Sequence, residues 1–121
     1  MTRLSPLPIL LLLALVLTAA PALAQPSVTV NGPSSVTVVD ICENVTWTCS
    51  ASGGEPPYVW YLWRVNGSLV TQGTSVTSYT RRYCTTEGTP PMTVSDTISC
   101  TVTDANGRTG TGSKNVTATF P

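Results

Sequence analysis

Hydrophobic and polar residues alternate along most of the chain after residue 25, and turn-forming residues recur every eight to twelve positions. A period of two places successive side chains on opposite faces of a β-strand. No window shows sustained helical spacing. The pattern therefore predicts an all-β chain, with strands at 27–30, 35–38, 44–52, 58–65, 68–72, 77–84, 92–104 and 115–120.

Seven or eight short strands in a chain of this length favour two sheets packed face to face. Asn66-Gly67, between the fourth and fifth of these strands, is a strong signal for a two-residue hairpin turn. We expect one β-sandwich over residues 35–121, preceded by an N-terminal strand and hinge at 25–34. The length of the chain leaves room for no second domain.

Half of the eight aromatic residues lie between positions 58 and 63. If Trp63 points into the sandwich, alternation places Trp60 and Leu62 outward, together with Tyr58. The predicted aromatic core then consists of Trp47, Tyr61 and Trp63. An outward apolar stripe often marks a contact surface, although a bulge or an overlying loop could also cover Trp60.

The first 24 residues have the features of a secretory signal peptide: Arg3, an apolar run from Leu7 to Leu17, and small residues at Ala22 and Ala24. Cleavage after Ala24 would leave residues 25–121, with six acidic and five basic residues. A retained anchor is the alternative, but the apolar run is short for a bilayer span. We expect a secreted chain, extracellular or at the cell surface, with no membrane span after cleavage.

Four cysteines are present, and there is no histidine and no Cys-x-x-Cys pair. In an exported chain, these features favour two disulfides over a metal site. Two disulfides would help a small domain whose hydrophobic core is modest. The residues are Cys42, Cys49, Cys84 and Cys100.

The spacing of Cys49, Trp63 and Cys100 resembles that of immunoglobulin-like domains. There a tryptophan on a core strand packs against a disulfide between the sheets. The resemblance implies a Greek-key sandwich in which Cys49 bonds to Cys100 and Cys42 lies near Cys84. Pairing of Cys42 with Cys49 and of Cys84 with Cys100 stays open on the sequence alone.

Two longer stretches, SGGEPPYVWYLWRVNG and TISCTVTDANGRTGTGS, resemble PKD-like and bacterial immunoglobulin-like modules of secreted and cell-surface proteins. The matching positions are Tyr61, Trp63, Asn66, Gly67, Val102, Thr103, Asp104 and Gly107. The cysteines are not part of the usual PKD pattern. This resemblance implies a fold much more specifically than it implies a function.

The sequence gives no support for catalysis or for nucleic-acid binding. Without histidine there is no Ser-His-Asp or Cys-His system, and Asp40 with Glu43 is the one close acidic pair. The other acids are scattered, so we predict neither a metal nor a cofactor. Arg81 and Arg82 are the one pair of adjacent bases. We therefore expect a protein that is not an enzyme.

Three Asn-x-Ser/Thr sequons occur, at Asn44, Asn66 and Asn115, on outward or turn positions of the predicted strands. They are candidate sites for covalent glycans if the organism has N-glycosylation. In a typical bacterium they would mean little.

We consider two functions. In the first, copies polymerise into an extracellular or cell-surface filament by donating the N-terminal strand, Ser27, Val28, Thr29 and Val30, across the hinge at Gly32-Pro33. The competing interpretation of this strand is a split first strand that pairs within its own molecule. In the second function, a monomeric binding module contacts a protein or carbohydrate through Tyr58, Trp60 and Leu62.

Overall fold

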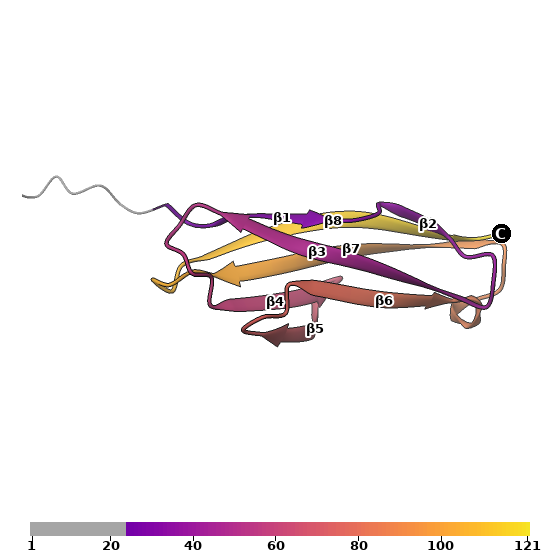
Figure 1. Ribbon diagram of the computed structural model, residues 1–121. Helices are drawn as coiled ribbons and strands as arrows, with labels where there is room; N and C mark the ends of the chain where they lie inside the picture. Colours follow the sequence, from indigo (N-terminus) through magenta and orange to yellow (C-terminus); the bar gives the residue numbers. More distant parts are fainter. Residues whose placement is uncertain (1–23) are drawn as a thin grey trace, which may run out of the picture.

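The computed structural model describes residues 24–121, and the signal-peptide prediction falls almost entirely outside this range. Eight strands and one short 3-10 turn form an elongated sandwich (Figure 1). The strands are β1 (Ser27–Asn31), β2 (Ser35–Thr37), β3 (Cys42–Ser52), β4 (Trp60–Val65), β5 (Ser68–Gly73), β6 (Ser78–Cys84), β7 (Met92–Thr103) and β8 (Thr109–Phe120). The 3-10 turn η1 covers Thr85–Glu87.

The strands divide into a three-stranded sheet, in the order β1-β3-β6, and a five-stranded sheet, in the order β2-β8-β7-β4-β5. All pairs are antiparallel except β2 with β8. The first strand is split, because β1 pairs with β3 in one sheet and β2 pairs with β8 in the other. The predicted immunoglobulin-like sandwich with two sheets is confirmed.

Both disulfides join the cysteines that the immunoglobulin-like resemblance implies. Cys49 and Cys100 bridge the two sheets, with their Cα atoms 6.3 Å apart. Cys42 and Cys84 are directly paired across β3 and β6, with Cα atoms 4.1 Å apart. The alternative pairing left open by the sequence is therefore excluded. The chain-entropy model assigns each closed loop roughly 4 kcal/mol of stability.

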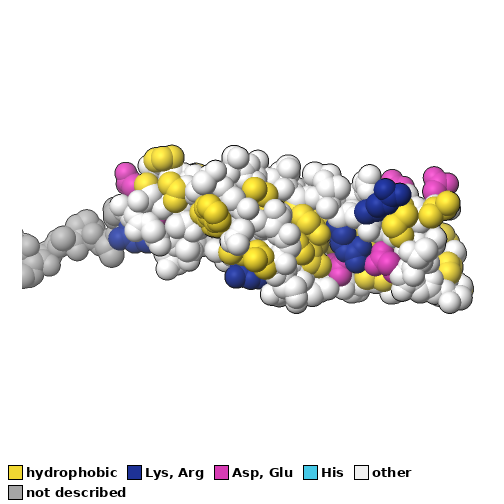
Figure 2. All heavy atoms as spheres, turned by 90° about the horizontal axis from the view of Figure 1, so that it is seen from below, with side chains coloured by type: hydrophobic (Ala, Val, Ile, Leu, Met, Phe, Trp, Pro, Cys, Tyr) yellow, Lys and Arg dark blue, Asp and Glu magenta, His cyan; other side chains and the backbone are white. Residues whose placement is uncertain are grey.

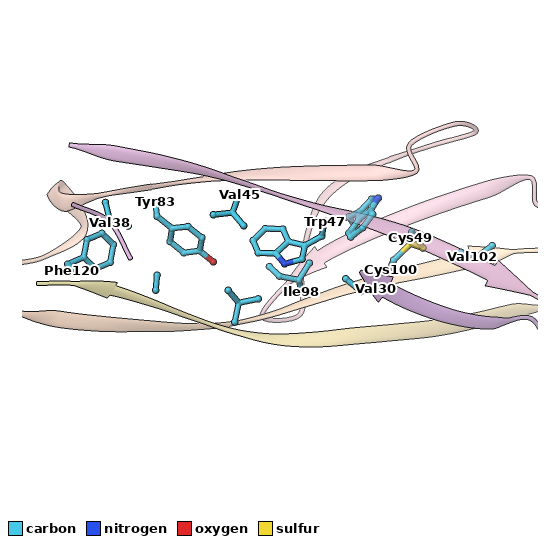
Figure 3. Packing of buried hydrophobic residues seen from close by; sticks show 13 residues of the cluster. Val30, Val38, Val45, Trp47, Cys49, Tyr83, Ile98, Cys100, Val102 and Phe120 are labelled. Atoms are coloured by element: carbon cyan, nitrogen blue, oxygen red, sulfur yellow. A yellow bond between two sulfur atoms is a disulfide. The ribbon is translucent and has the colours of Figure 1, made fainter. Parts of the chain in front are cut away.

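The core is a single row of side chains along the length of the sandwich, from Phe120 at one end to the Cys49–Cys100 bridge near the other (Figure 3). Trp47 and Trp63 are fully buried. The Tyr79 ring lies between them, with centroids 6.3 Å from Trp47 and 6.0 Å from Trp63. Each indole N–H donates to a backbone carbonyl, so that neither buried polar group is left unpaired.

The hairpin predicted at Asn66-Gly67 is present, and both residues have positive φ, at 52° and 84°. A two-residue turn of this handedness matches the twist of the strands that it joins. The Asn66 side chain also ties the turn to β7, since its amide donates to Asp96 at 2.8 Å and its oxygen accepts from the Thr97 N–H at 2.8 Å.

The strand ends lie within one residue of the sequence prediction except at three starts, and the first of these is β3, which begins at Cys42. The strand predicted from residue 58 begins at Trp60, and Val59, which alternation from an inward Trp63 would place inside, is 43% exposed. The reason is that the preceding turn is held by Asp104, whose carboxylate accepts from the Glu55 N–H at 3.0 Å, so alternation starts later. The last strand is longer than predicted and begins at Thr109.

Candidate contact surfaces

Several apolar side chains of β4 and β5 are exposed or half-buried. Trp60 is 38% exposed, and its indole N–H donates to Gln72 at 3.3 Å, which holds the ring along β5. Leu62 lies next to Gln72 in register and is half-buried. Leu69 and Val70 are exposed by 53% and 41%. We call Trp60, Leu62, Leu69, Val70 and Gln72 the β4–β5 surface.

The structure places the three residues of the predicted stripe differently. Trp60 and Leu62 belong to the β4–β5 surface, but Tyr58 packs against the core and donates its hydroxyl hydrogen to the Gly53 carbonyl at 2.9 Å. Tyr58 is therefore not part of an outward stripe, because it precedes the strand. Among the predicted core residues, Trp47 and Trp63 are buried and Tyr61 is half-buried.

The sequence did not lead us to expect Leu69 and Val70 at the surface. The β4–β5 register shifts by one residue, so that Trp63 pairs with Thr71 while Arg64 pairs with Leu69. Val70 is the extra residue, and an extra residue interrupts the alternation of faces. The available signal was the sequence Ser-Leu-Val-Thr, in which two apolar residues are adjacent in a short strand that follows a tight turn.

Hydroxyl groups cover the rest of the five-stranded sheet. Thr101 and Thr111 are hydrogen-bonded across β7 and β8 at 2.8 Å, and Thr97 donates to Asn115 at 3.1 Å. The three-stranded sheet has a similar pair in Thr46 and Thr80, at 2.7 Å. Such threonine pairs stabilise neighbouring strands. They leave the apolar β4–β5 surface distinct from its surroundings.

The predicted donor strand is seated in its own chain. From Ser27 to Asn31, β1 pairs with β3, and its Val30 side chain is buried. On its other side β1 lies against Gly110 and Gly112 of β8, and a Cβ atom at either glycine would clash with the backbone at Pro26 or Val28. These two glycines provide the space that β1 occupies.

The segment that follows β1 is held at two points. Trp47 donates to the Pro33 carbonyl at 2.9 Å, and Lys114 donates to the Gly32 carbonyl at 2.9 Å. Gly32 has φ of 145°, and a side chain there would meet the Trp47 ring. The predicted hinge is thus a fitted connection between the two sheets in this structure.

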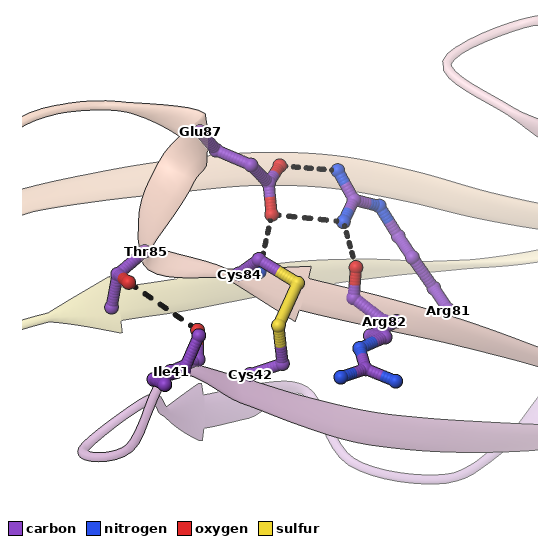
Figure 4. The surroundings of a disulfide bond; sticks show 7 residues. All are labelled: Ile41, Cys42, Arg81, Arg82, Cys84, Thr85 and Glu87. Carbon is purple, nitrogen blue, oxygen red and sulfur yellow. Dashed lines mark hydrogen bonds and ion pairs between the residues drawn. A yellow bond between two sulfur atoms is a disulfide. The ribbon is translucent and has the colours of Figure 1, made fainter.

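A charged network lies at the end of the sandwich that carries the Cys42–Cys84 bond (Figure 4). Arg81 pairs with Glu87 at 2.9 Å and with the buried carboxylate of Asp96 at 3.0 Å. The Tyr83 hydroxyl donates to Asp96 at 2.7 Å, and burial together with this carboxylate raises the pKa of Tyr83. Arg81 lowers the pKa of Glu87, helped by the Cys84 N–H.

This network has a structural role. The carboxylate of Asp96 is occupied by Arg81 and Tyr83 of β6 and by Asn66 of the β4–β5 turn. A buried charge is stable only when it is paired and hydrogen-bonded.

Beside the network, Val39 and Ile41 are exposed by 73% and 72% and line an open hollow with Arg82 and Thr85.

Asp104 is fully buried in the turn before β8. Burial alone raises the pKa of its carboxyl, but hydrogen bonds from the amides of Arg108, Glu55 and Asn106 lower it overall. All three donors belong to the turns at this end of the sandwich. Asp104 therefore fixes the turn before β4, and with it the start of that strand.

The three sequon asparagines are all exposed, on β3, at the β4–β5 turn and on β8. Within residues 24–121, no group of three His, Cys, Asp or Glu side chains could hold a metal ion. In the same range, no helix is long and apolar enough to cross a membrane.

Comparison with solved structures identifies a protein with a similar fold. The chain is similar to a solved structure of fibronectin(III)-like modules of CbhA from Clostridium thermocellum, with a TM-score of 0.55 and 15% sequence identity. The match covers 83% of this chain and 48% of that chain, so this chain spans about half the length of its structural neighbour. No family model matches the chain. A search of curated proteins also finds no match.

At this identity the likeness concerns the fold alone. It supports the resemblance to immunoglobulin-like modules drawn from the cysteines and Trp63. The narrower resemblance to PKD-like modules stays a prediction. The two disulfides are consistent with an extracellular location.

Proposed function

We propose that this chain is an exported, non-enzymatic module that contacts another macromolecule through the β4–β5 surface. The main observation behind this proposal is that Trp60, Leu62, Leu69 and Val70 are exposed or half-buried on two adjacent strands. Soluble proteins seldom expose contiguous apolar patches without a functional reason. The Trp60 ring is held by Gln72, so little freedom of its side chain would be lost on binding.

The surroundings of this surface support the same proposal. Arg64, the charged residue on β4, directs its guanidinium toward Thr101 of β7, on the side away from β5. Figure 2 views the molecule from the side on which β5 and β6 lie in Figure 1. Charged side chains lie toward both ends of this view, and the middle is mainly hydrophobic and uncharged apart from a basic side chain. The five residues of this surface carry no charge, so removing them from water requires no desolvation of a charge of their own.

The test compares the wild-type chain with Trp60→Ala in the producing organism, by measuring the fraction that stays with cells or surface material and the fraction free in the medium. Thr48→Ala is the matched control, an exposed position on the other sheet. We expect Trp60→Ala to move the chain into the medium and Thr48→Ala to leave the distribution unchanged. An unchanged distribution for Trp60→Ala would refute the proposal.

Strand donation into a filament is the second candidate function. The observation in its favour is the groove between β3 and the two glycines of β8, which could take residues 26–31 of another copy as well as its own. Negative-stain electron microscopy of native, unreduced material tests it. Regular fibres that are lost when residues 25–31 are deleted would support donation. Material without fibres would exclude it.

Covalent glycans are a further part of this proposal. The candidate sites are Asn44 on β3, Asn66 at the β4–β5 turn and Asn115 on β8. Sugars on Asn44 and Asn115 would lie away from the β4–β5 surface, whereas the side chain of Asn66 is hydrogen-bonded to Asp96 and Thr97. Mass measurement before and after enzymatic deglycosylation tests for them, and identical masses would exclude N-linked sugar.

A further inference from the structure

The four strands at the edges of the two sheets are protected to different degrees. An unprotected edge offers unpaired backbone N–H and C=O groups to another chain, and proteins usually block it with charges, proline, shortness or cover. The free side of β1 is covered by Gly110 and Gly112 of β8. In the five-stranded sheet, the edge strand β2 is protected by its shortness, since it has three residues. The remaining two edges are β5 and β6.

Charge distinguishes β6 from β5. In β6, the sequence SYTRRYC carries Arg81 and Arg82, so a second copy laid along it would bring arginines together. In β5, the sequence SLVTQG contains neither a charged residue nor proline. Its one protective feature is the extra residue at Val70, which bends the strand locally. Thus β5 is the long edge of this sandwich without charges.

We infer that β5 pairs with β5 of a second copy, in antiparallel orientation across a two-fold axis, and joins the two five-stranded sheets. This inference goes beyond the proposed function, because it concerns the backbone edge of β5 and leaves the outer face of β4 free for another contact. In a two-fold contact each residue meets the same surface of its copy. Pairing of β5 with itself opposes uncharged side chains alone, and apolar and threonine pairs across strands are favourable.

The side chains around the edge favour a second copy over a charged peptide. Leu69 and Val70 are exposed at the edge strand, and Leu62 lies beside them on β4. In an edge-to-edge pair, the β5 side chains of one copy would lie beside those of the other, while backbone hydrogen bonds would form between the strands. Because Arg64 is directed toward β7, its charge does not lie between the two copies.

The experiment is sedimentation velocity of the purified, oxidised chain 25–121 over concentrations from about 1 μM to about 1 mM, the range of weak self-association. The variants are Val70→Lys and Leu69→Lys, both at exposed positions of β5. Ser78→Lys is the control, with the same added charge on the exposed start of β6. Amide hydrogen exchange of residues 68–73 is followed at the same concentrations.

We expect a concentration-dependent dimer whose dissociation constant rises at least about tenfold in each β5 variant, because each places two lysines in one contact. Ser78→Lys should leave dimerisation unchanged, and exchange of the β5 amides should slow as dimers form. A monomer at every concentration would overturn the inference, as would a dimer insensitive to both β5 variants. If Trp60→Ala releases the chain from cells while the pure chain stays monomeric, β5 pairing fails and the proposed function stands.

Discussion

Replacing Gly112 by alanine tests how tightly β1 fits against β8. A Cβ atom at this position would lie 2.7 Å from the carbonyl carbon of Val28 and closer still to its oxygen. Both neighbours are backbone atoms, so no side chain can turn away to make room. The change should therefore displace β1 from its position beside β3.

Two effects of this substitution have opposite signs. Alanine in place of glycine within a strand is favourable by about 0.5 to 1 kcal/mol, since glycine loses more freedom on folding. Displacement of β1 exposes part of Val30, whose full burial is worth about 1.5 to 3 kcal/mol, and forces a backbone shift of similar cost. We expect net destabilisation of about 2 kcal/mol, or about 8 to 16 °C in Tm for a domain of this size.

The assay is urea and thermal unfolding of the oxidised chain, followed by tryptophan fluorescence and circular dichroism. Ser113→Ala, at the next position of β8 but on its exposed face, is the control and should change stability by less than about 0.5 kcal/mol. A Gly112→Ala variant as stable as the wild type, or more stable, would refute the fitted position of β1.

Three further predictions follow from the buried charges and the disulfides. Asp96→Asn should cost about 2 kcal/mol or more in unfolding experiments, because Arg81 and Tyr83 lose a buried carboxylate, and an equal stability would contradict this role. Because the pKa of Asp104 is lowered in the folded state, its contribution to stability is complete above about pH 4 and is lost as the pH falls toward the folded-state pKa. Asp104→Asn should therefore flatten the fall of Tm at acid pH. A variant with the same dependence of Tm on pH as the wild type would contradict this role of Asp104. Replacing Cys49 and Cys100 together by alanine should destabilise the chain more than replacing Cys42 and Cys84, since the first bond is also part of the core, and the reverse order of Tm values would be inconsistent with this packing.

The parts of the fold that were predictable from the sequence depend on local signals. Alternation gave the number and faces of the strands, and Asn66-Gly67 marked its hairpin because few other residues accept two positive φ angles. The spacing of Cys49, Trp63 and Cys100 implied the bridge between the sheets, which the structure confirms.

The errors have non-local causes. Tyr58 and Val59 depart from the predicted alternation because Asp104, far along the chain, fixes the turn before them. The outward position of Val70 depends on a register shift against β4, which strand periodicity does not reveal. Glycine inside a strand often marks a close approach of another backbone, but which strand approaches Gly110 and Gly112 depends on the sheet order.

The most direct test of where copies of this chain meet is an isotope-filtered nuclear Overhauser experiment. Chains labelled with heavy nitrogen are mixed with chains labelled with heavy carbon, unfolded and refolded together with their disulfides reformed. We predict contacts between differently labelled chains along Ser68–Gly73, while Val30 contacts Cys49 within a single chain. Contacts between chains at Val30 and Cys49, or none at β5, would contradict the account.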